Sequence, residues 1–126
     1  MQKKLPDVAV KGLALTFLLS ICASGRLQAQ FTRLLREPAL HGSKVAFVYA
    51  ADLWVADIDG SNVVRLTSTP AVESNPAFSP DGKTIAFSSN RSGVTAVYTV
   101  PVTGGEPIRL TWYPAAALVR GWTPDG

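Results

Sequence analysis

The residue types most able to do acid–base or nucleophilic chemistry do not combine into a catalytic set in this sequence. A serine hydrolase needs an activated serine and a histidine base, but no serine stands in a Gly-x-Ser-x-Gly elbow. The single histidine, His41, precedes Gly42 where a later, similar stretch has Asp81 before Gly82. His41 is therefore predicted to be a turn residue, and we expect no catalytic residue in this chain.

Oxygen-bearing side chains alternate along the stretch Asp57-Ile58-Asp59-Gly60-Ser61-Asn62, a composition that suits Ca²⁺. The stretch lacks the closing glutamate and the 12-residue spacing of a calcium-binding loop. The equivalent stretch Pro101–Gly105 has no carboxylate, so this turn can form without a metal ion. We therefore expect no metal site and no bound cofactor.

Aromatic side chains could provide a stacking surface for bases or sugars. The candidates are Trp54, Tyr98, Trp112, Tyr113 and Trp122. Trp54, Tyr98 and Trp122 occupy recurring places in an internal repeat, which favours packing inside the fold. Trp112 and Tyr113 stand where the earlier copy has Ser68 and Thr69, and they are predicted to be exposed.

Residues 1–29 have the three regions of a secretory leader: a basic start, an apolar run over residues 13–23 and a short polar end. This pattern predicts a signal peptide that is cleaved after Ala29, and hence export to the periplasm or the medium of a bacterium. The apolar run is shorter than the roughly 20 residues of a membrane span, so no stable anchor is expected. Cys22 lies in the run and would leave with it; a lipidated Cys22 is the alternative, disfavoured by the bulky Ile21 before it.

The net charge of +3 belongs to the leader, because the rest of the chain holds equal numbers of basic and acidic side chains. A basic protein would otherwise suggest a polyanion as partner. After removal of the leader no such field remains, so nucleic acid is not an expected partner.

An internal repeat organises the remainder of the chain. Aligning residues 52–82 with residues 96–126 gives nine identities in 31 positions. The residues that recur are Gly60, Arg65, Leu66, Thr67, Pro70, Ala71, Pro80, Asp81 and Gly82. Upstream, Val45-Ala46-Phe47 matches Ile85-Ala86-Phe87, and the later copy carries four extra residues within 88–95. Insertion in a loop is what a repeated sheet tolerates.

Within one copy, short apolar or β-branched runs alternate with turn residues. The predicted strands are 75–79, 84–88, 95–100 and 107–111, and Ser79-Pro80-Asp81-Gly82 has the composition of a type I turn. Four strands in a period of 40 to 45 residues predict an all-β fold of four-stranded antiparallel propeller blades. The predicted layout is a signal peptide, 1–29, and a partial β-propeller, 30–126. Blade 1 covers about 34–70, blade 2 about 71–114, and blade 3 starts at about 115–126.

The repeat motifs resemble those of known propellers. The segments Phe78–Lys83, Ile85–Phe87, Val97-Tyr98, Gly104–Pro107 and Arg109–Thr111 look like the WD-repeat-like blades of TolB and of several serine peptidases. The segments Leu34–Arg36, Pro38, His41-Gly42, Lys44–Ala50, Asp52–Trp54 and Gly121–Gly126 resemble the opening of tricorn-protease-like enzymes. Glu37 and Asp57-Ile58-Asp59 depart from the usual pattern.

This resemblance implies a propeller that filters peptides ahead of a second propeller, a PDZ-like domain and a serine peptidase domain. The leading hypothesis is therefore the substrate-gating propeller of an exported tricorn-like serine protease. Its expected partners are peptide or protein substrates and the remaining blades and C-terminal domains of a longer parent chain, with homo-oligomerisation of the parent left open. The alternatives are a TolB-like interaction scaffold, or the propeller of a prolyl-oligopeptidase-like or amidohydrolase enzyme.

Overall fold

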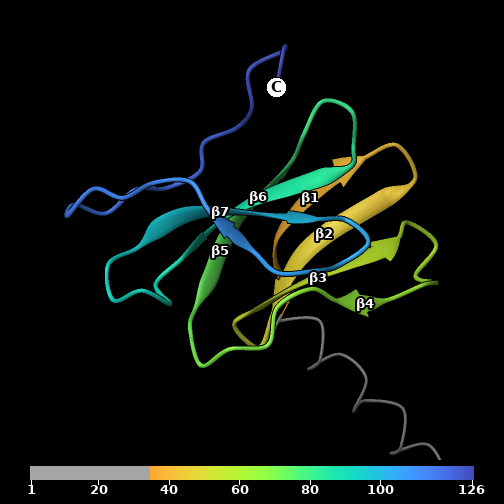
Figure 1. The fold of residues 1–126 in the computed structure, drawn as a ribbon. Helices are drawn as coiled ribbons and strands as arrows, with labels where there is room; N and C mark the ends of the chain where they lie inside the picture. The colour runs from red at the N-terminus through yellow and green to blue at the C-terminus, as the bar shows by residue number, and fades with distance from the viewer. Residues whose placement is uncertain (1–34) are drawn as a thin grey trace, which may run out of the picture. The chain divides into compact units, whose positions relative to one another are not determined.

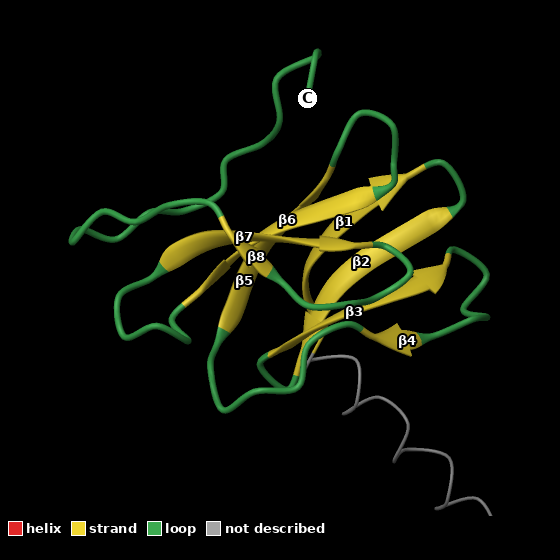
Figure 2. Cartoon of the chain, viewed as in Figure 1, coloured by secondary structure: helices red, strands yellow, loops and turns green. Residues whose placement is uncertain are grey.

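The computed structural model describes residues 35–126, so the predicted leader and its cleavage site lie outside the described residues. The described part forms two four-stranded antiparallel sheets and contains no helix (Figures 1 and 2). The first sheet consists of β1 (Leu35–His41), β2 (Lys44–Tyr49), β3 (Asp52–Asp57) and β4 (Val64–Arg65). The second consists of β5 (Glu73–Phe78), β6 (Thr84–Ser89), β7 (Ala96–Pro101) and β8 (Ile108–Arg109). Across residues 35–126 no helix has the length and apolarity that a membrane span requires.

Each sheet is a meander in which strands follow one another in chain order. This confirms the predicted all-β class and the predicted four-stranded blades. The fourth strand of the second sheet is shorter than the predicted 107–111. The ladder ends early because the hydroxyl of Thr111, and not a backbone carbonyl, accepts the Val97 N–H at 2.9 Å.

The turn at Ser79–Gly82 has the predicted form. The Gly82 N–H donates to the Ser79 carbonyl at 2.9 Å, and Gly82 has a φ of 69°. In the first sheet the equivalent connection is shorter, because His41 and Lys44 are paired and only Gly42 and Ser43 lie between them. His41 is thus the last residue of β1 and the first residue of the four-residue turn that ends at Lys44.

The apolar core joins the two sheets. β5 packs against β1 and β2. Side chains from both sheets meet in one buried cluster made up of Ala46, Leu53, Val55, Leu66, Ile85, Phe87, Ala96, Tyr98 and Val100. Its members alternate along the strands, as expected when one face of a pleated strand is buried. Burial of this cluster is the main force that holds one sheet on the other.

The segment after β8 crosses the second sheet in the same way as β5 crosses the first. The Glu73 N–H donates to the Ala51 carbonyl at 2.9 Å, and the Ala117 N–H donates to the equivalent Thr95 carbonyl at 2.8 Å. Further along, the Trp122 indole N–H donates to the Ala77 carbonyl at 2.9 Å. Residues 117–122 therefore contact the second sheet as the first strand of a further blade would.

Candidate binding surface

His41 is a packing residue in this structure. Its ring lies 5.8 Å from the ring of Phe78, centroid to centroid. A Cβ atom on Gly82 would come within 2.3 Å of the His41 ring, so the glycine makes room for it. His41 therefore joins the first turn of one sheet to the first turn of the next.

The carboxylates of the acidic loop at Asp57–Asn62 accept hydrogen bonds from donors within the loop and from Lys44 of β2. The Asp57 carboxylate accepts from Lys44 Nζ at 2.9 Å and from Asn62 Nδ2 at 2.5 Å, and Ser61 Oγ donates to Asp59 at 2.6 Å. Hydrogen bonds from Asn62 and Lys44 hold the pKa of the Asp57 carboxyl below its ordinary value. Hydrogen bonds from the Ser61 side chain and backbone do the same to the pKa of Asp59. Within residues 35–126 no group of three or more His, Cys, Asp or Glu side chains is arranged to hold a metal ion.

The recurring Arg-Leu-Thr sequence makes the same clasp in both sheets. Thr67 Oγ1 accepts the Leu53 N–H at 2.8 Å, as Thr111 Oγ1 accepts the Val97 N–H. Arg65 Nε donates to the Thr67 carbonyl at 2.9 Å, and Arg109 Nε donates to the Thr111 carbonyl at 2.6 Å. These contacts tie the outermost strand to the one before it, which explains why the arginine and the threonine recur.

The guanidinium group of the arginine has a different partner in each of the two sheets. The guanidinium of Arg65 donates to the Asp52 carboxylate at 2.5 Å and lies 5.8 Å from the Trp54 ring. In the second sheet Ala96 stands at the position of Asp52, so no acid is present there. The guanidinium of Arg109 lies instead 4.5 Å from the ring of Trp112.

The aromatic residues separate into two groups, as the repeat predicts. Tyr98 is 5% exposed and stacks on Phe87. The Trp54 indole N–H donates to the Tyr49 carbonyl at 3.2 Å. Trp112 and Tyr113 are 75% and 73% exposed. Their predicted exposure is thus confirmed, and they are the largest unburied side chains of the described residues.

A buried ion pair, missed by sequence reasoning, lies where β5 begins. Glu73 is 1% exposed, and its carboxylate accepts from the guanidinium of Arg91 at 2.6 Å. The same guanidinium lies 5.3 Å from the Phe87 ring and 4.9 Å from the Tyr98 ring. Arg91 lies in the stretch 88–95, where the second repeat carries four extra residues, so this longer connection contributes a buried contact to the fold. The insertion itself was the only signal in the sequence.

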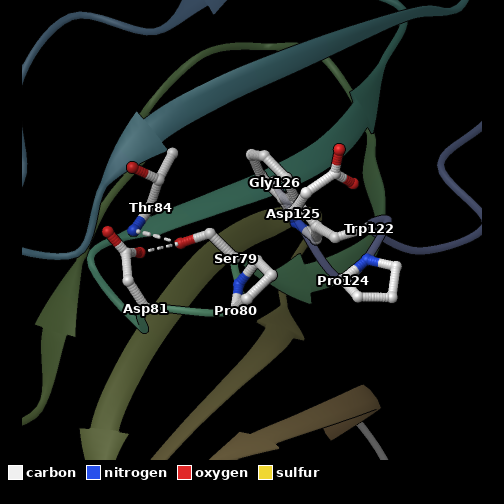
Figure 3. A pocket seen from close by; sticks show the side chains of 8 residues that line it. All are labelled: Ser79, Pro80, Asp81, Thr84, Trp122, Pro124, Asp125 and Gly126. Atoms are coloured by element: carbon white, nitrogen blue, oxygen red, sulfur yellow. Dashed lines mark hydrogen bonds between the residues drawn. The ribbon is translucent and has the colours of Figure 1, made fainter.

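One cavity lies between two successive copies of the Pro-Asp-Gly turn (Figure 3). It has a volume of about 280 Å³ and is lined by Ser79, Pro80, Asp81, Thr84, Trp122, Pro124, Asp125 and Gly126. The Ser79 hydroxyl donates to Asp81 at 2.6 Å and accepts the Thr84 N–H at 3.0 Å (Figure 3). The donated bond holds the pKa of the Asp81 carboxyl below its ordinary value, with help from the Lys83 N–H. Because these bonds occupy the hydroxyl, the cavity offers contact surface without an activated nucleophile.

This chain is similar to known proteins in its sequence and its fold. The sequence pattern of the tricorn protease N-terminal β-propeller domain matches residues 32–126. Tricorn protease homolog 1 of Streptomyces coelicolor is 42% identical over 93 residues, which are 73% of this chain and 9% of that protein. A crystal structure of the tricorn protease matches 62% of this chain and 8% of its own, with a TM-score of 0.55 and 32% identity. A putative TolB from Agrobacterium tumefaciens matches 68% of this chain and 32% of its own, with a TM-score of 0.60 and 28% identity.

Proposed function

Because this chain belongs to the family of tricorn protease N-terminal β-propeller domains, we propose that it forms the substrate-gating propeller of an exported serine peptidase. The main support for this proposal is that the sequence pattern of the family extends over both sheets and the segment that follows them. The chain spans 9% of the length of the Streptomyces relative, so the peptidase itself is assigned to the longer protein.

The packing of the strands supports a gating role. The first strands of the two sheets, β1 and β5, lie against each other. In a propeller the blades are arranged around a central channel, and neighbouring strands of this kind form its wall. A narrow channel of this type admits an extended peptide and excludes folded protein.

One set of assays can test whether the peptidase activity belongs to the longer protein and not to this chain alone. The chain alone should hydrolyse neither casein nor short peptides, since the one histidine packs on Phe78 and Gly82. The whole protein should cleave unfolded casein in preference to a folded protein, and a serine-directed inhibitor should abolish that cleavage. Inhibitor-sensitive turnover by the chain alone would contradict the assignment.

Export is proposed from the sequence of residues 1–29 alone. After expression in a bacterium, the mass of the mature protein should correspond to an N-terminus within a few residues of Gln30. Protein in the soluble fraction that still begins with Met1 would exclude cleavage.

A TolB-like scaffold is the second candidate, favoured by the TM-score of 0.60 over 68% of the chain. Under this alternative the whole protein would hydrolyse nothing and would bind a protein of the cell envelope. An inactive whole protein that co-purifies with such a partner after crosslinking would favour the scaffold over the peptidase.

A further inference from the structure

The outer edge of the second sheet departs from the repeat at three linked positions. Asp52 becomes Ala96, which leaves the recurring arginine without its carboxylate. Ser68 and Thr69 become Trp112 and Tyr113. The guanidinium of Arg109 therefore has no acid partner of this kind, and two aromatic side chains follow it closely along the chain. The hydrogen bonds of the Arg-Leu-Thr sequence are retained.

The first repeat shows which exposed residues of this edge a following blade would cover. Leu66 is 8% exposed where the second sheet packs on the first, whereas its equivalent Leu110 is 53% exposed. Exposure of Leu110 is therefore no sign of a binding site. Ser68 and Thr69, in contrast, remain exposed although the second sheet is present. Trp112 and Tyr113 occupy equivalent positions and would stay on the surface beside a further blade.

The guanidinium of Arg109 is held in place and still has donors to offer. Its Nε is fixed on the Thr111 carbonyl at 2.6 Å, and the ring of Trp112 lies 4.5 Å from the guanidinium carbon. Among the described residues no carboxylate lies within ion-pair distance of it, whereas Arg65 is paired with Asp52. A preorganised guanidinium offers its two terminal nitrogens to a carboxylate as a fork.

We propose that Arg109, Trp112 and Tyr113 form a docking site for an acidic, extended polypeptide segment of a partner protein. A carboxylate of the segment accepts hydrogen bonds from the terminal nitrogens of Arg109, and its apolar neighbours contact the two rings. β8 is an edge strand of its sheet, so its outer side can pair with an added strand. The residues after the leader hold equal numbers of basic and acidic side chains, so one arginine suits a carboxylate of a peptide better than a nucleic acid or an anionic membrane.

The test uses the whole protein and a fluorescein-labelled heptapeptide of alternating glutamate and valine, with binding followed by fluorescence anisotropy. A matched peptide with glutamine in place of glutamate should bind at least about tenfold more weakly, because the charged hydrogen bonds are lost. Ala96→Asp should reduce binding of the acidic peptide by a similar factor, since it restores the internal acid that occupies Arg65 in the first repeat.

Two further variants keep the test decisive if Ala96→Asp fails to fold. The double variant Trp112→Ser with Tyr113→Thr introduces the residues of the first repeat at exposed positions, and it should also lose about tenfold in affinity. Ser68→Ala in the first repeat is the matched control and should bind like the unaltered protein. Equal binding of the two peptides, or unchanged binding by both the Ala96 and the aromatic variants, would overturn the proposal. The proposal would also be overturned if the protein did not bind the peptide but bound anionic vesicles through the same residues.

Discussion

Glu37 and Ser88 each accept a hydrogen bond from a backbone N–H of the following blade. Each blade presents a backbone N–H to the preceding blade, from Asn75 in one case and from Val119 in the other. The Asn75 N–H donates to the Glu37 carboxylate, and the Val119 N–H donates to Ser88 Oγ at 2.9 Å. Val48 stands at the position of Ser88 in the first sheet and cannot accept a hydrogen bond. Glu37 thus supplies the acceptor that Val48 cannot provide.

Replacement of Glu37 should therefore weaken the contact between the two sheets. We expect Glu37→Ala to lower the free energy of unfolding by about 1 kcal/mol, because one backbone donor loses its partner. Glu37→Gln retains an acceptor oxygen and should lose less. Urea unfolding of the three proteins measures the difference, and equal losses for the two variants would show that the hydrogen bond contributes nothing.

The lowered pKa values of Asp57, Asp59 and Asp81 predict a loss of stability in acid. A carboxyl whose pKa is lower in the folded protein stabilises it above the ordinary value of 3.8, and this contribution disappears as the pH falls through the folded-state pKa. Unfolding midpoints in urea should thus fall between about pH 5 and pH 2. Asp81→Asn should have a shallower dependence than the unaltered chain, and an identical slope would argue against a role for the turn.

At the level of single residues, the sequence predicted which positions recur but not what their side chains contact. Arg65 and Arg109 recur together, yet only the structure shows that one meets Asp52 and the other Trp112. Likewise Glu73 and Arg91 are 18 residues apart, and their pairing depends on how the second sheet packs. Such contacts arise from tertiary packing, on which local patterns carry no information.

At the level of elements, the connection between β2 and β3 contains an unfavourable pair of residues. Tyr49 and Asp52 are paired, and Ala50 and Ala51 between them have φ values of 51° and 71°. A two-residue hairpin with positive φ at both positions favours Asn-Gly, because an alanine side chain crowds the backbone there. The sheet forms in spite of this turn, since pairing and burial of β2 and β3 outweigh the local cost.

The double variant Ala50→Asn with Ala51→Gly should therefore stabilise the chain. Relief of the left-handed alanines predicts a gain of about 1 kcal/mol in the free energy of unfolding. The Ala51 carbonyl, which accepts the Glu73 N–H, is retained in the variant. Ala116→Gly is the control, because Ala116 is exposed with a negative φ and glycine should be neutral or destabilising there. A gain of the same size in the control would point to a general effect of glycine.

Strand positions were the most predictable part of the fold. Short apolar or β-branched runs between turn residues placed β5, β6 and β7 to within two residues of the predicted ranges, because strands favour such residues and turns interrupt them. The end of β8 was predicted too late, since a threonine hydroxyl takes the role of the next backbone carbonyl. The turn at Ser79–Gly82 was predictable because its residues favour that geometry without help from distant contacts.

At the level of the whole molecule, each blade depends on its neighbour for burial. The core is shared between the two sheets, and Leu66 of the first is buried because the second packs on it. On the opposite face of the second sheet, Leu110 and Leu118 remain 53% and 45% exposed. Because stacking supplies much of a repeat's stability, we expect the chain alone to unfold at low denaturant and to self-associate.

A matched pair of leucines tests this dependence directly. In the chain alone, Leu66→Ala should cost about 2 to 5 kcal/mol because the side chain is buried, whereas Leu110→Ala should cost less than about 1 kcal/mol. In the whole protein, where a following blade is proposed to cover Leu110, the two substitutions should become similarly destabilising. Denaturant titrations of both variants in both contexts measure the change. If Leu110→Ala does not lower the free energy of unfolding of the whole protein, no further blade covers this face. That result would argue against a closed propeller.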